Sequence, residues 1–241
     1  MDGRCEEKRG TELDGQYGAP ISAFVRYNPA CGDLRSSAGG RPSPYGARVA
    51  DEHGAWRTFG ERTIYDNKWV RLGLVDVEAP NGERWDYHVV HFGRIAIAMI
   101  VNDADEVLML WRYRFAIDQW GYELLGGLVE DGEDAASAAA REAAEESGWA
   151  PVGEPEKLIS FEPLPGNATA PVDVYLWRRA DRIGEPTDTE EAGRVEWVPL
   201  SRVLSLAERG QLLGSGAVVP LLYYLASRGP ALRKDEPVES P

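Results

Sequence analysis

Apolar residues that recur with a period of two fill the middle of the chain and predict β-strands. The segment "TIYDNKWVRLGLVDVEAPNGERWDYHVVHFG" has two runs of β-branched and aromatic residues around the turn signal "APNG", which predicts a hairpin. Val70, Leu72 and Leu74 alternate onto one face and Val75 and Val77 onto the other, which predicts a bulge or burial on both sides. Farther along, "RIAIAMIV" and "VLMLWRYRF" flank the turn "NDADE" and predict a second hairpin.

A helical pattern follows these strands in "EDAASAAAREAAEESG", where alanines favour a helix, the acidic start suits the helix dipole and Gly148 provides a stop. Beyond it, "VDVYLWRR" and "RVEWVPL" predict strands on either side of the acidic loop "GEPTDTEEAG". Two helices are predicted near "SRVLSLAERG" and "AVVPLLYYLASRG". This order of elements predicts an α+β fold, an α/β/α sandwich with a mixed β-sheet.

Neither end of the chain shows the strand period of two residues or the helix period of 3.6 residues. Residues 1–54 include the Ser-, Gly- and Pro-rich run "SSAGGRPSPYGA" and are predicted to be a disordered extension, as is a tail over residues 229–241. Between them we predict a small N-terminal β module over residues 55–93 and a larger domain over residues 94–228. The two cysteines, Cys5 and Cys31, lie in the extension and indicate neither a disulfide framework nor a zinc site.

Charge narrows the range of partners. The formal net charge is −14 and the sequence pI is about 4.7, which argues against binding to nucleic acid or to an anionic membrane, because both depend on excess Lys and Arg. No apolar run approaches the roughly 18 residues that span a bilayer. We therefore predict a cytoplasmic protein with neither a nucleic-acid nor a membrane partner.

Three glutamates share one stripe of the predicted helix. At 100° per residue, Glu145 and Glu146 project within about 60° of Glu142. Like charges at this spacing destabilise a helix by only a few tenths of a kcal/mol each, so an ordinary solvated face and a metal site both remain open from spacing alone. In the second interpretation a divalent cation offsets the repulsion, and oxygen ligands suit Mg²⁺, with Mn²⁺ as a possible substitute.

The residues around the stripe favour the metal site. Reading from Gly127 to Trp149, the chain has the pattern G-x5-E-x7-R-E-U-x-E-E-x-G-U, where U is apolar, and it resembles the Nudix hydrolase box at every fixed position. Independently of that resemblance, Gly126 has no side chain and can bring its carbonyl close to the carboxylates. Arg141 can orient carboxylates through a bidentate contact, for which Glu133 is the predicted partner.

The resemblance implies a Mg²⁺-dependent enzyme that hydrolyses a nucleoside diphosphate linked to another moiety. Carried over by position, the implied metal ligands are Glu142, Glu146, the Gly126 carbonyl and Glu145, which alternatively activates water. The implied catalytic set is Glu145, Glu146, Arg141, Glu133, Glu190 and Glu191. Of these, Glu133 and Arg141 are supporting residues. The acidic loop either delivers Glu190 or Glu191 as the base or is only a connection, and both interpretations stay open.

A wider resemblance, to the ADP-ribose pyrophosphatase branch, rests on "VLMLWRYRF" and "GYELLGGLVEDGE". It implies that Arg112 and Arg114 bind the substrate with Glu123 close to them, although charge alone fits an ion-paired strand edge equally well. Two departures weaken the assignment to ADP-ribose. Leu125 replaces a usual proline, which is a minor packing change, whereas "PLPGNATAPVDVYLW" lacks the Ser-Asp that often precedes the next strand, which counts against ADP-ribose specifically. Other nucleoside diphosphate sugars therefore remain open.

Two alternative functions stay open besides the hydrolysis of ADP-ribose or a related nucleoside diphosphate sugar. One is a Nudix hydrolase of nucleoside triphosphates or dinucleotides, and the other is a nucleotide-sugar sensor without turnover. The intact set of Glu142, Glu145 and Glu146 argues against the sensor. A homodimer is also predicted, from the family resemblance and from the aromatic strands of the module over residues 55–93.

Overall fold

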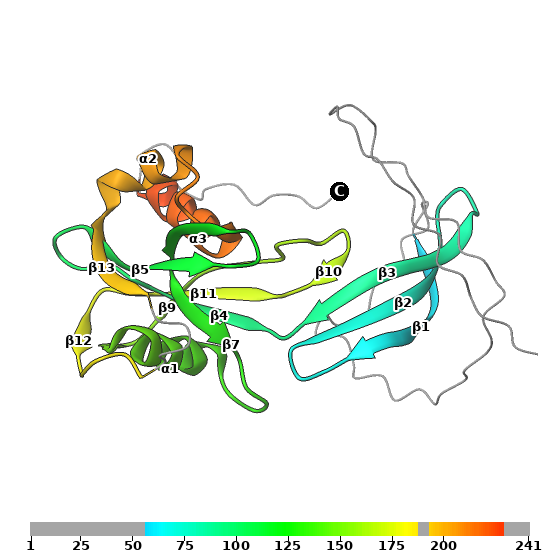
Figure 1. Ribbon diagram of the computed structural model, residues 1–241, viewed down its shortest axis with the longest axis horizontal. Helices are drawn as coiled ribbons and strands as arrows, with labels where there is room; N and C mark the ends of the chain where they lie inside the picture. Colours follow the sequence, from blue (N-terminus) through cyan, green and yellow to red (C-terminus); the bar gives the residue numbers. More distant parts are fainter. Residues whose placement is uncertain (1–55, 188–192, 229–241) are drawn as a thin grey trace, which may run out of the picture. The chain divides into compact units, whose positions relative to one another are not determined.

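The computed structural model describes residues 56–187 and 193–228 (Figure 1). The predicted disordered extension over residues 1–54, the predicted tail over residues 229–241, both cysteines, Glu190 and Glu191 lie outside the described residues. Among the described residues, no helix has the length and apolar character needed to span a membrane.

The first predicted hairpin is present and forms part of a four-stranded sheet, in the order β1-β2-β3-β10. Strands β2 and β3 are antiparallel and in continuous register, and the Ala79 N–H donates to the Glu83 carbonyl at 2.8 Å in their turn. The irregularities in this sheet lie between β1 and β2, one of them at Gly60. The strands are β1 (Arg57–Asp66), β2 (Val70–Glu78), β3 (Arg84–Phe92) and β10 (Ala168–Thr169), the last of which pairs in parallel with β3.

The remaining strands form a mixed sheet, an antiparallel sheet and a short pair. The mixed sheet has the order β7-β4-β11-β9, the antiparallel sheet has the order β13-β5-β6, and β12 pairs with β8. Their bounds are β4 (Ile95–Ile100), β5 (Glu106–Arg114), β6 (Gln119–Glu123), β7 (Leu125–Leu128), β8 (Trp149–Pro151), β9 (Glu156–Phe161), β11 (Val172–Trp177), β12 (Ala180–Arg182) and β13 (Arg194–Pro199).

The predicted second hairpin is wrong. A turn does join β4 to β5, with the Asp105 N–H donating to the Asn102 carbonyl at 3.1 Å, but the two strands enter different sheets. The two strands are linked by one isolated antiparallel bridge, from Val101 to Val107. Each strand instead takes two other neighbours, β7 and β11 for β4 and β6 and β13 for β5. Both strands are buried on both faces, and such central strands need partners on each side.

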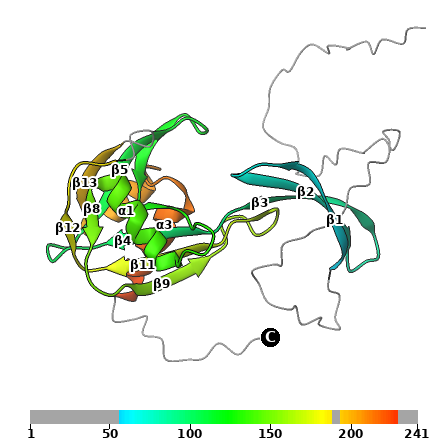
Figure 2. The same cartoon turned by 90° about the horizontal axis from the view of Figure 1, so that it is seen from below.

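The predicted α/β/α sandwich with a mixed sheet is confirmed. In Figure 1, α1 lies below the strands, while α2 and α3 lie above them, and Figure 2 shows the same arrangement from below. One apolar core packs against α2 and α3 and includes Met99, Met109 and Leu221, and the other packs against α1 and includes Leu108 and Leu110. The helices are α1 (Ala135–Ser147), the 3-10 helix η1 (Leu200–Arg202), α2 (Val203–Glu208) and α3 (Gly214–Ser227).

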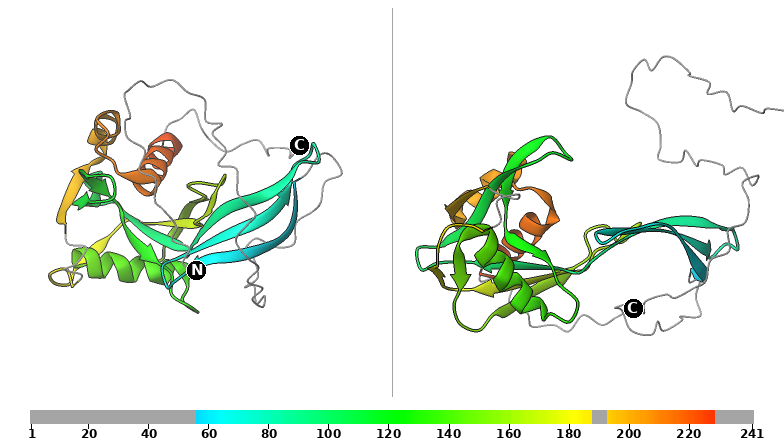
Figure 3. Two further views of the ribbon diagram at one scale, coloured as in Figure 1. Left: turned by 45° about the vertical axis from the view of Figure 1, so that its right-hand side comes forward. Right: turned by 60° about the horizontal axis from the view of Figure 1, so that its bottom comes forward.

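Helix α1 has the start and stop that the sequence predicts. The Asp134 carboxylate caps its first turn by accepting from the N–H groups of Ala136 at 3.0 Å and Ser137 at 3.1 Å. Gly148 ends it in the left-handed region at φ 73°, where a side chain would collide with the Gly184 carbonyl. Alanines on the inner face of α1 are buried against the small residues of β4, so the helix lies close to the mixed sheet (Figure 3).

Candidate active site

Two glycines in β7 make room for the glutamates of α1. A Cβ atom on Gly127 would lie 2.5–2.7 Å from the three carboxyl atoms of Glu142, and a Cβ atom on Gly126 would collide with the Ala96 carbonyl in β4. The Gly126 N–H donates to the Glu146 carboxylate at 2.8 Å. The two glycines therefore permit a close approach between β7 and two of the predicted carboxylate ligands, Glu142 and Glu146.

Arg141 uses all five of its N–H donors to fix the carboxylates around it. Nε and one terminal nitrogen bind the two oxygens of Glu133 at 2.9 and 3.0 Å. The other terminal nitrogen donates to Glu142 at 2.8 Å and to Glu145 at 3.1 Å. A fifth bond reaches the Leu128 carbonyl at 3.2 Å. The bidentate partnership with Glu133, expected from the sequence, is thus present, and it ties the loop before α1 to the glutamate stripe.

This network shifts the pKa values of its members. Hydrogen bonds from Arg141, followed by one from the Glu130 N–H, lower the pKa of the Glu133 carboxyl below its usual value. Hydrogen bonds to Glu133 raise the already high pKa of Arg141 further, against the opposing effect of its burial. Both shifts favour the charged forms, so Arg141 and Glu133 stay ionised throughout the neutral range.

Glu146 has a different environment from the other two glutamates. Its side chain is 3% exposed, compared with 45% for Glu145 and 19% for Glu142. The Arg112 guanidinium, 4% exposed, donates to Glu146 at 2.5 Å from β5. A buried carboxylate needs such a counter-charge, because burial penalises an isolated charge heavily. The stripe on α1 therefore runs from a buried, arginine-paired end to a solvent-exposed one.

Glu123 lies between the two predicted substrate-binding arginines. It is 3.3 Å from Nε of Arg112 and makes a bidentate contact with Arg114, at 2.9 Å from Nε and 2.7 Å from a terminal nitrogen. The ion-paired interpretation of Arg112 and Arg114 thus has its contacts in the structure, and the substrate role stays a prediction. The two arginines differ in access, because Arg114 is 42% exposed and Arg112 is 4% exposed.

The residues of the stripe suit a divalent cation in chemical type. Three carboxylates on one side of a helix, next to the two glycines of β7, provide the oxygen donors that Mg²⁺ and Mn²⁺ prefer. In the described part of the chain, no three His, Cys, Asp or Glu side chains converge tightly enough to hold a metal ion. The carboxylate oxygens of Glu142, Glu145 and Glu146 accept hydrogen bonds from Arg141, Arg112 and the Gly126 N–H instead. The metal-ligand assignment therefore stays a prediction.

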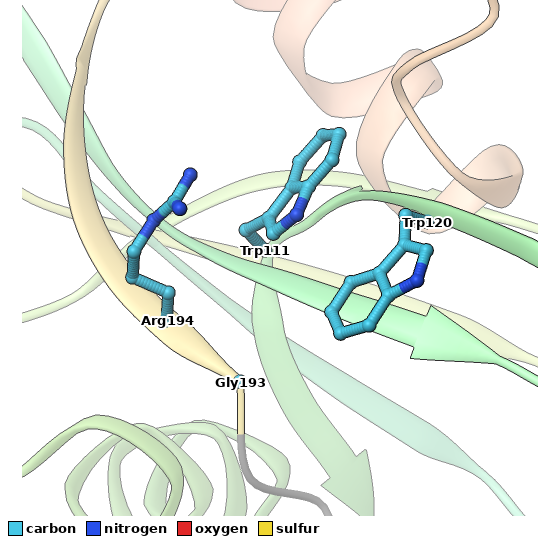
Figure 4. Close-up of a pocket in the computed structure, with 4 residues that line it drawn as sticks. All are labelled: Trp111, Trp120, Gly193 and Arg194. Atoms are coloured by element: carbon cyan, nitrogen blue, oxygen red, sulfur yellow. The ribbon is translucent and has the colours of Figure 1, made fainter.

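A second feature lies on the opposite face of β5. A pocket of about 630 Å³ is lined by Trp111, Trp120, Gly193 and Arg194 (Figure 4). The two indole rings are nearly parallel, at 17°, with centroids 6.4 Å apart. Neighbouring strand residues point to opposite faces, so Trp111 turns away from the side on which Arg112 meets Glu146. This pocket was not predicted from the sequence, although the alternation in "WRYR" carried the signal.

Comparison with known proteins decides the family. The family model described as NUDIX domain matches residues 91–214, which is more than half of the chain. The chain belongs to the Nudix family. In this Nudix hydrolase the matched range includes the whole glutamate stripe and the arginines around it. Enzymes of the family use divalent metal ions, which agrees with the donor chemistry of the stripe.

Curated relatives and solved structures extend the match. A relative from Streptomyces rubellomurinus, "CMP-5'-(N-acetyl-N-hydroxy-3-aminopropyl)phosphonate hydrolase", is 38% identical over 174 residues, covering 72% of this chain and 84% of the relative. The "ADP-ribose pyrophosphatase" of Bacillus subtilis is 28% identical over 170 residues, covering 69% of this chain and 91% of that protein. The solved structure "Crystal structure of ADP compounds hydrolase" superposes with a TM-score of 0.63 at 19% identity, over 73% of this chain and 96% of that one, and supports the fold.

Proposed function

We propose that this Nudix hydrolase uses Mg²⁺, with Mn²⁺ as a substitute, to cleave the pyrophosphate linkage of ADP-ribose or a related nucleoside diphosphate sugar. The products are a nucleoside monophosphate and a sugar phosphate. The observation that carries the proposal is the set of three glutamates on α1, two of them held by Arg141, beside Gly126 and Gly127 of β7, which have no side chains. A polyanionic linkage is the chemistry that needs such a site.

The residues divide the work in the proposed reaction. Glu142 and Glu146 hold the cation together with the Gly126 carbonyl, and Glu145, the most exposed of the three carboxylates, is a further ligand or the group that takes a proton from water. A bound divalent cation withdraws charge from the diphosphate and lowers the pKa of bound water. Arg141 and Glu133 keep the stripe in place. Glu190 and Glu191, proposed as alternatives for the base, lie outside the described residues.

Substrate contact is assigned to Arg114 and Glu123 rather than equally to both arginines. Arg114 is partly open to solvent and is oriented by the bidentate contact with Glu123, so its solvent-exposed side can approach a phosphate. Arg112 is enclosed and meets Glu146. This division modifies the expectation from sequence, which treated the two arginines alike.

A second candidate substrate is a nucleoside monophosphate joined to a phosphonate. The relative from Streptomyces rubellomurinus is named for such a compound and is 38% identical over its match. Its bond to be broken is also an anhydride between two phosphorus atoms, so the same carboxylate stripe serves both substrates. The departure before β11 also points away from ADP-ribose itself. The two candidates therefore differ in the leaving group and base, and the reaction class is shared.

We also propose a homodimer, because the first sheet has much uncovered apolar surface. Its strands and turns expose large side chains by 45–58%, namely Trp56, Phe59, Ile64, Tyr65, Trp69 and Phe92. Aromatic surface of this extent is typical of an interaction site. Light scattering at micromolar concentration should give twice the chain mass of 26.6 kDa, and a monomer mass there would contradict the proposal.

The test of function compares the wild type with Glu146→Gln, which keeps the size of the side chain and removes its charge. ADP-ribose, other nucleoside diphosphate sugars, a cytidine 5'-monophosphate–alkylphosphonate anhydride, dinucleotides and nucleoside triphosphates are incubated with Mg²⁺ or with chelator, and the products are separated by chromatography. Metal-dependent release of AMP and ribose 5-phosphate, or of CMP and the phosphonate, is the expected result. The variant should lose at least about 100-fold in rate.

Glu154→Gln is the matched control, because it removes the same charge from an exposed position outside α1. It should keep the wild-type rate. Release of pyrophosphate from nucleoside triphosphates would favour the alternative hydrolase. If every compound survived while one of them raised the melting temperature, the sensor without turnover would replace the proposal.

A further inference from the structure

Arg112 and Glu146 form a buried ion pair inside the candidate active site. The two side chains are 4% and 3% exposed and their atoms lie 2.5 Å apart. The second oxygen of Glu146 accepts from the Gly126 N–H at 2.8 Å. Both Glu146 oxygens thus have protein donors, in a residue whose proposed task is to bind a divalent cation.

Arg112 competes with a divalent cation for the Glu146 carboxylate. A guanidinium and a divalent cation are both attracted to the same carboxylate, and each weakens the attraction of the other. By thermodynamic linkage, a pair that opposes metal binding is itself weakened by the metal to the same extent, with typical couplings of about 5- to 150-fold. A substrate-binding arginine that did not touch Glu146 would show no such coupling.

A second carboxylate makes it possible for Arg112 to leave Glu146 without becoming an isolated buried charge. Glu123 is 3.3 Å from Nε of Arg112 and is 17% exposed. Glu123 is in turn held by Arg114, so four charges of alternating sign run from Glu146 in α1 into β5 and β6 of the antiparallel sheet. The guanidinium is therefore placed between two carboxylates, one of which the proposed function assigns to the metal.

We propose that Arg112 is a positioning residue that serves as the internal counter-cation of Glu146 and yields that carboxylate to the divalent metal, keeping Glu123 as its own partner. This inference rests on the proposed function, because it takes Glu146 as a metal ligand. It gives Arg112 a role distinct from contact with substrate. Without metal, Arg112 balances the charge of Glu146 and keeps its carboxylate in place, and the same contact sets how tightly the metal binds.

The test measures Mn²⁺ affinity directly, from the electron paramagnetic resonance signal of free Mn²⁺, in the absence of substrate. Arg112→Met removes the charge and keeps an apolar stem of similar length. We expect this variant to bind Mn²⁺ at least about fivefold more tightly than the wild type, the lower end of typical coupling. Mn²⁺ should also raise the melting temperature of the variant more than that of the wild type, because Glu146 loses its counter-cation in the metal-free state.

Two variants separate this role from others. Arg114→Met removes an equal charge from the same strand, at a side chain oriented by Glu123, and should change the Mn²⁺ dissociation constant less than about twofold. Arg112→Lys keeps the charge but loses the planar fork, and its affinity should lie between those of the wild type and Arg112→Met. Circular dichroism of each variant shows whether it is folded, and Arg112→Lys carries the test if Arg112→Met is not.

The outcomes are distinguishable. Tighter Mn²⁺ binding in Arg112→Met, with little change in Arg114→Met, supports the inference. Equal or weaker binding in Arg112→Met overturns it and leaves the proposed function standing. Equal shifts in both variants also overturn it, since they indicate a general field rather than the Glu146 contact. A wild type that binds no Mn²⁺ overturns both the inference and the metal-dependent function.

Discussion

The sheet that contains β1 and the sandwich around β4 are both built of paired strands but reach opposite states of burial. All ten residues of β1 are exposed, whereas five of the six residues of β4 are buried. β4 has strand neighbours on both sides and helices over both faces, whereas β1 pairs with β2 and lies at the end of the order of its sheet. Strand pattern thus indicates which residues can be buried, and the covering partner decides which ones are.

The largest expected effect contrasts two aliphatic truncations. Leu108→Ala, in the core between α1 and the sheets, should lower the free energy of unfolding by about 2–5 kcal/mol, because Leu108 is fully buried and leaves a cavity. Ile64→Ala in β1, where Ile64 is 46% exposed, should change it by less than about 0.5 kcal/mol in the monomer. Urea titration of both variants at low protein concentration measures the difference. An Ile64→Ala loss that grows with concentration would show that a partner covers β1.

The next contrast places a methyl group at a glycine in each region. Gly127→Ala should reduce kcat/KM by about tenfold or more, because the new Cβ displaces a Glu142 carboxylate that Arg141 holds at 2.8 Å. Gly73→Ala in β2 meets the end of the Glu61 side chain, which can turn to solvent, so its activity should stay within about twofold. Steady-state kinetics decides the comparison. Equal activity of both variants would show that the position of Glu142 is unimportant for turnover.

A smaller effect on the free energy of unfolding is expected from removing a side-chain cap, which both regions have. Asp134→Ala removes the cap of α1 and should cost about 1 kcal/mol of unfolding free energy. Asn67→Ala removes a similar cap from the turn between β1 and β2, where its side-chain oxygen accepts from the N–H groups of Trp69 and Val70, each at 2.8 Å. Its cost should be comparable, measured by the same urea titration. A much larger loss for either variant would show that one region depends more on its local cap.

The smallest effect concerns two carboxyls with lowered pKa values. Hydrogen bonds from Arg141 lower the pKa of Glu133, and a hydrogen bond from Arg84 lowers that of Asp76 in the first sheet. A folded-state pKa below the unfolded value gives stability that is present above the unfolded pKa and is lost as the pH falls through the folded one. The wild type should therefore be more stable than Glu133→Gln or Asp76→Asn at pH 7. This difference in the free energy of unfolding should shrink as the pH falls to 2, which urea titration at each pH measures.

Salt sharpens this last contrast. The Arg84 and Asp76 side chains are 49% and 37% exposed, against 29% and 19% for Arg141 and Glu133. At about 1 M NaCl, where the Debye length is roughly 3 Å, the difference between wild type and Asp76→Asn should shrink more than the difference between wild type and Glu133→Gln. Equal shrinkage would show that the Arg141 network is screened as an ordinary surface pair is.

The sequence predicted the parts of this molecule that local spacing determines. Helix α1, its stop at Gly148 and the pairing of Arg141 with Glu133 follow from residues within one short segment. It failed where partners are distant in the chain. The predicted hairpin of β4 and β5 was wrong because periodicity identifies a strand but not its neighbours. The polar strand β1 was not predicted for the related reason that its residues show little apolar alternation.

The candidate site shows the same division. The glutamate stripe is visible in the sequence, whereas the contact between Arg112 and Glu146 joins residues 34 positions apart. Alternation along β5 puts Arg112 and Trp111 on opposite faces but does not say what each face meets. The assignment of metal ligands and of the base stays a prediction that the proposed kinetics and Mn²⁺ titrations test.

The full use of Arg141 has a consequence for how this gene can vary. Its five N–H groups reach four different residues, and a lysine has three donors on a single nitrogen. Any substitution of Arg141 that a single nucleotide change can produce therefore removes at least two of these hydrogen bonds. The exposed positions of β1 can therefore accept substitutions of small effect one after another. At position 141 every first substitution disrupts the network at once, so no conservative intermediate exists.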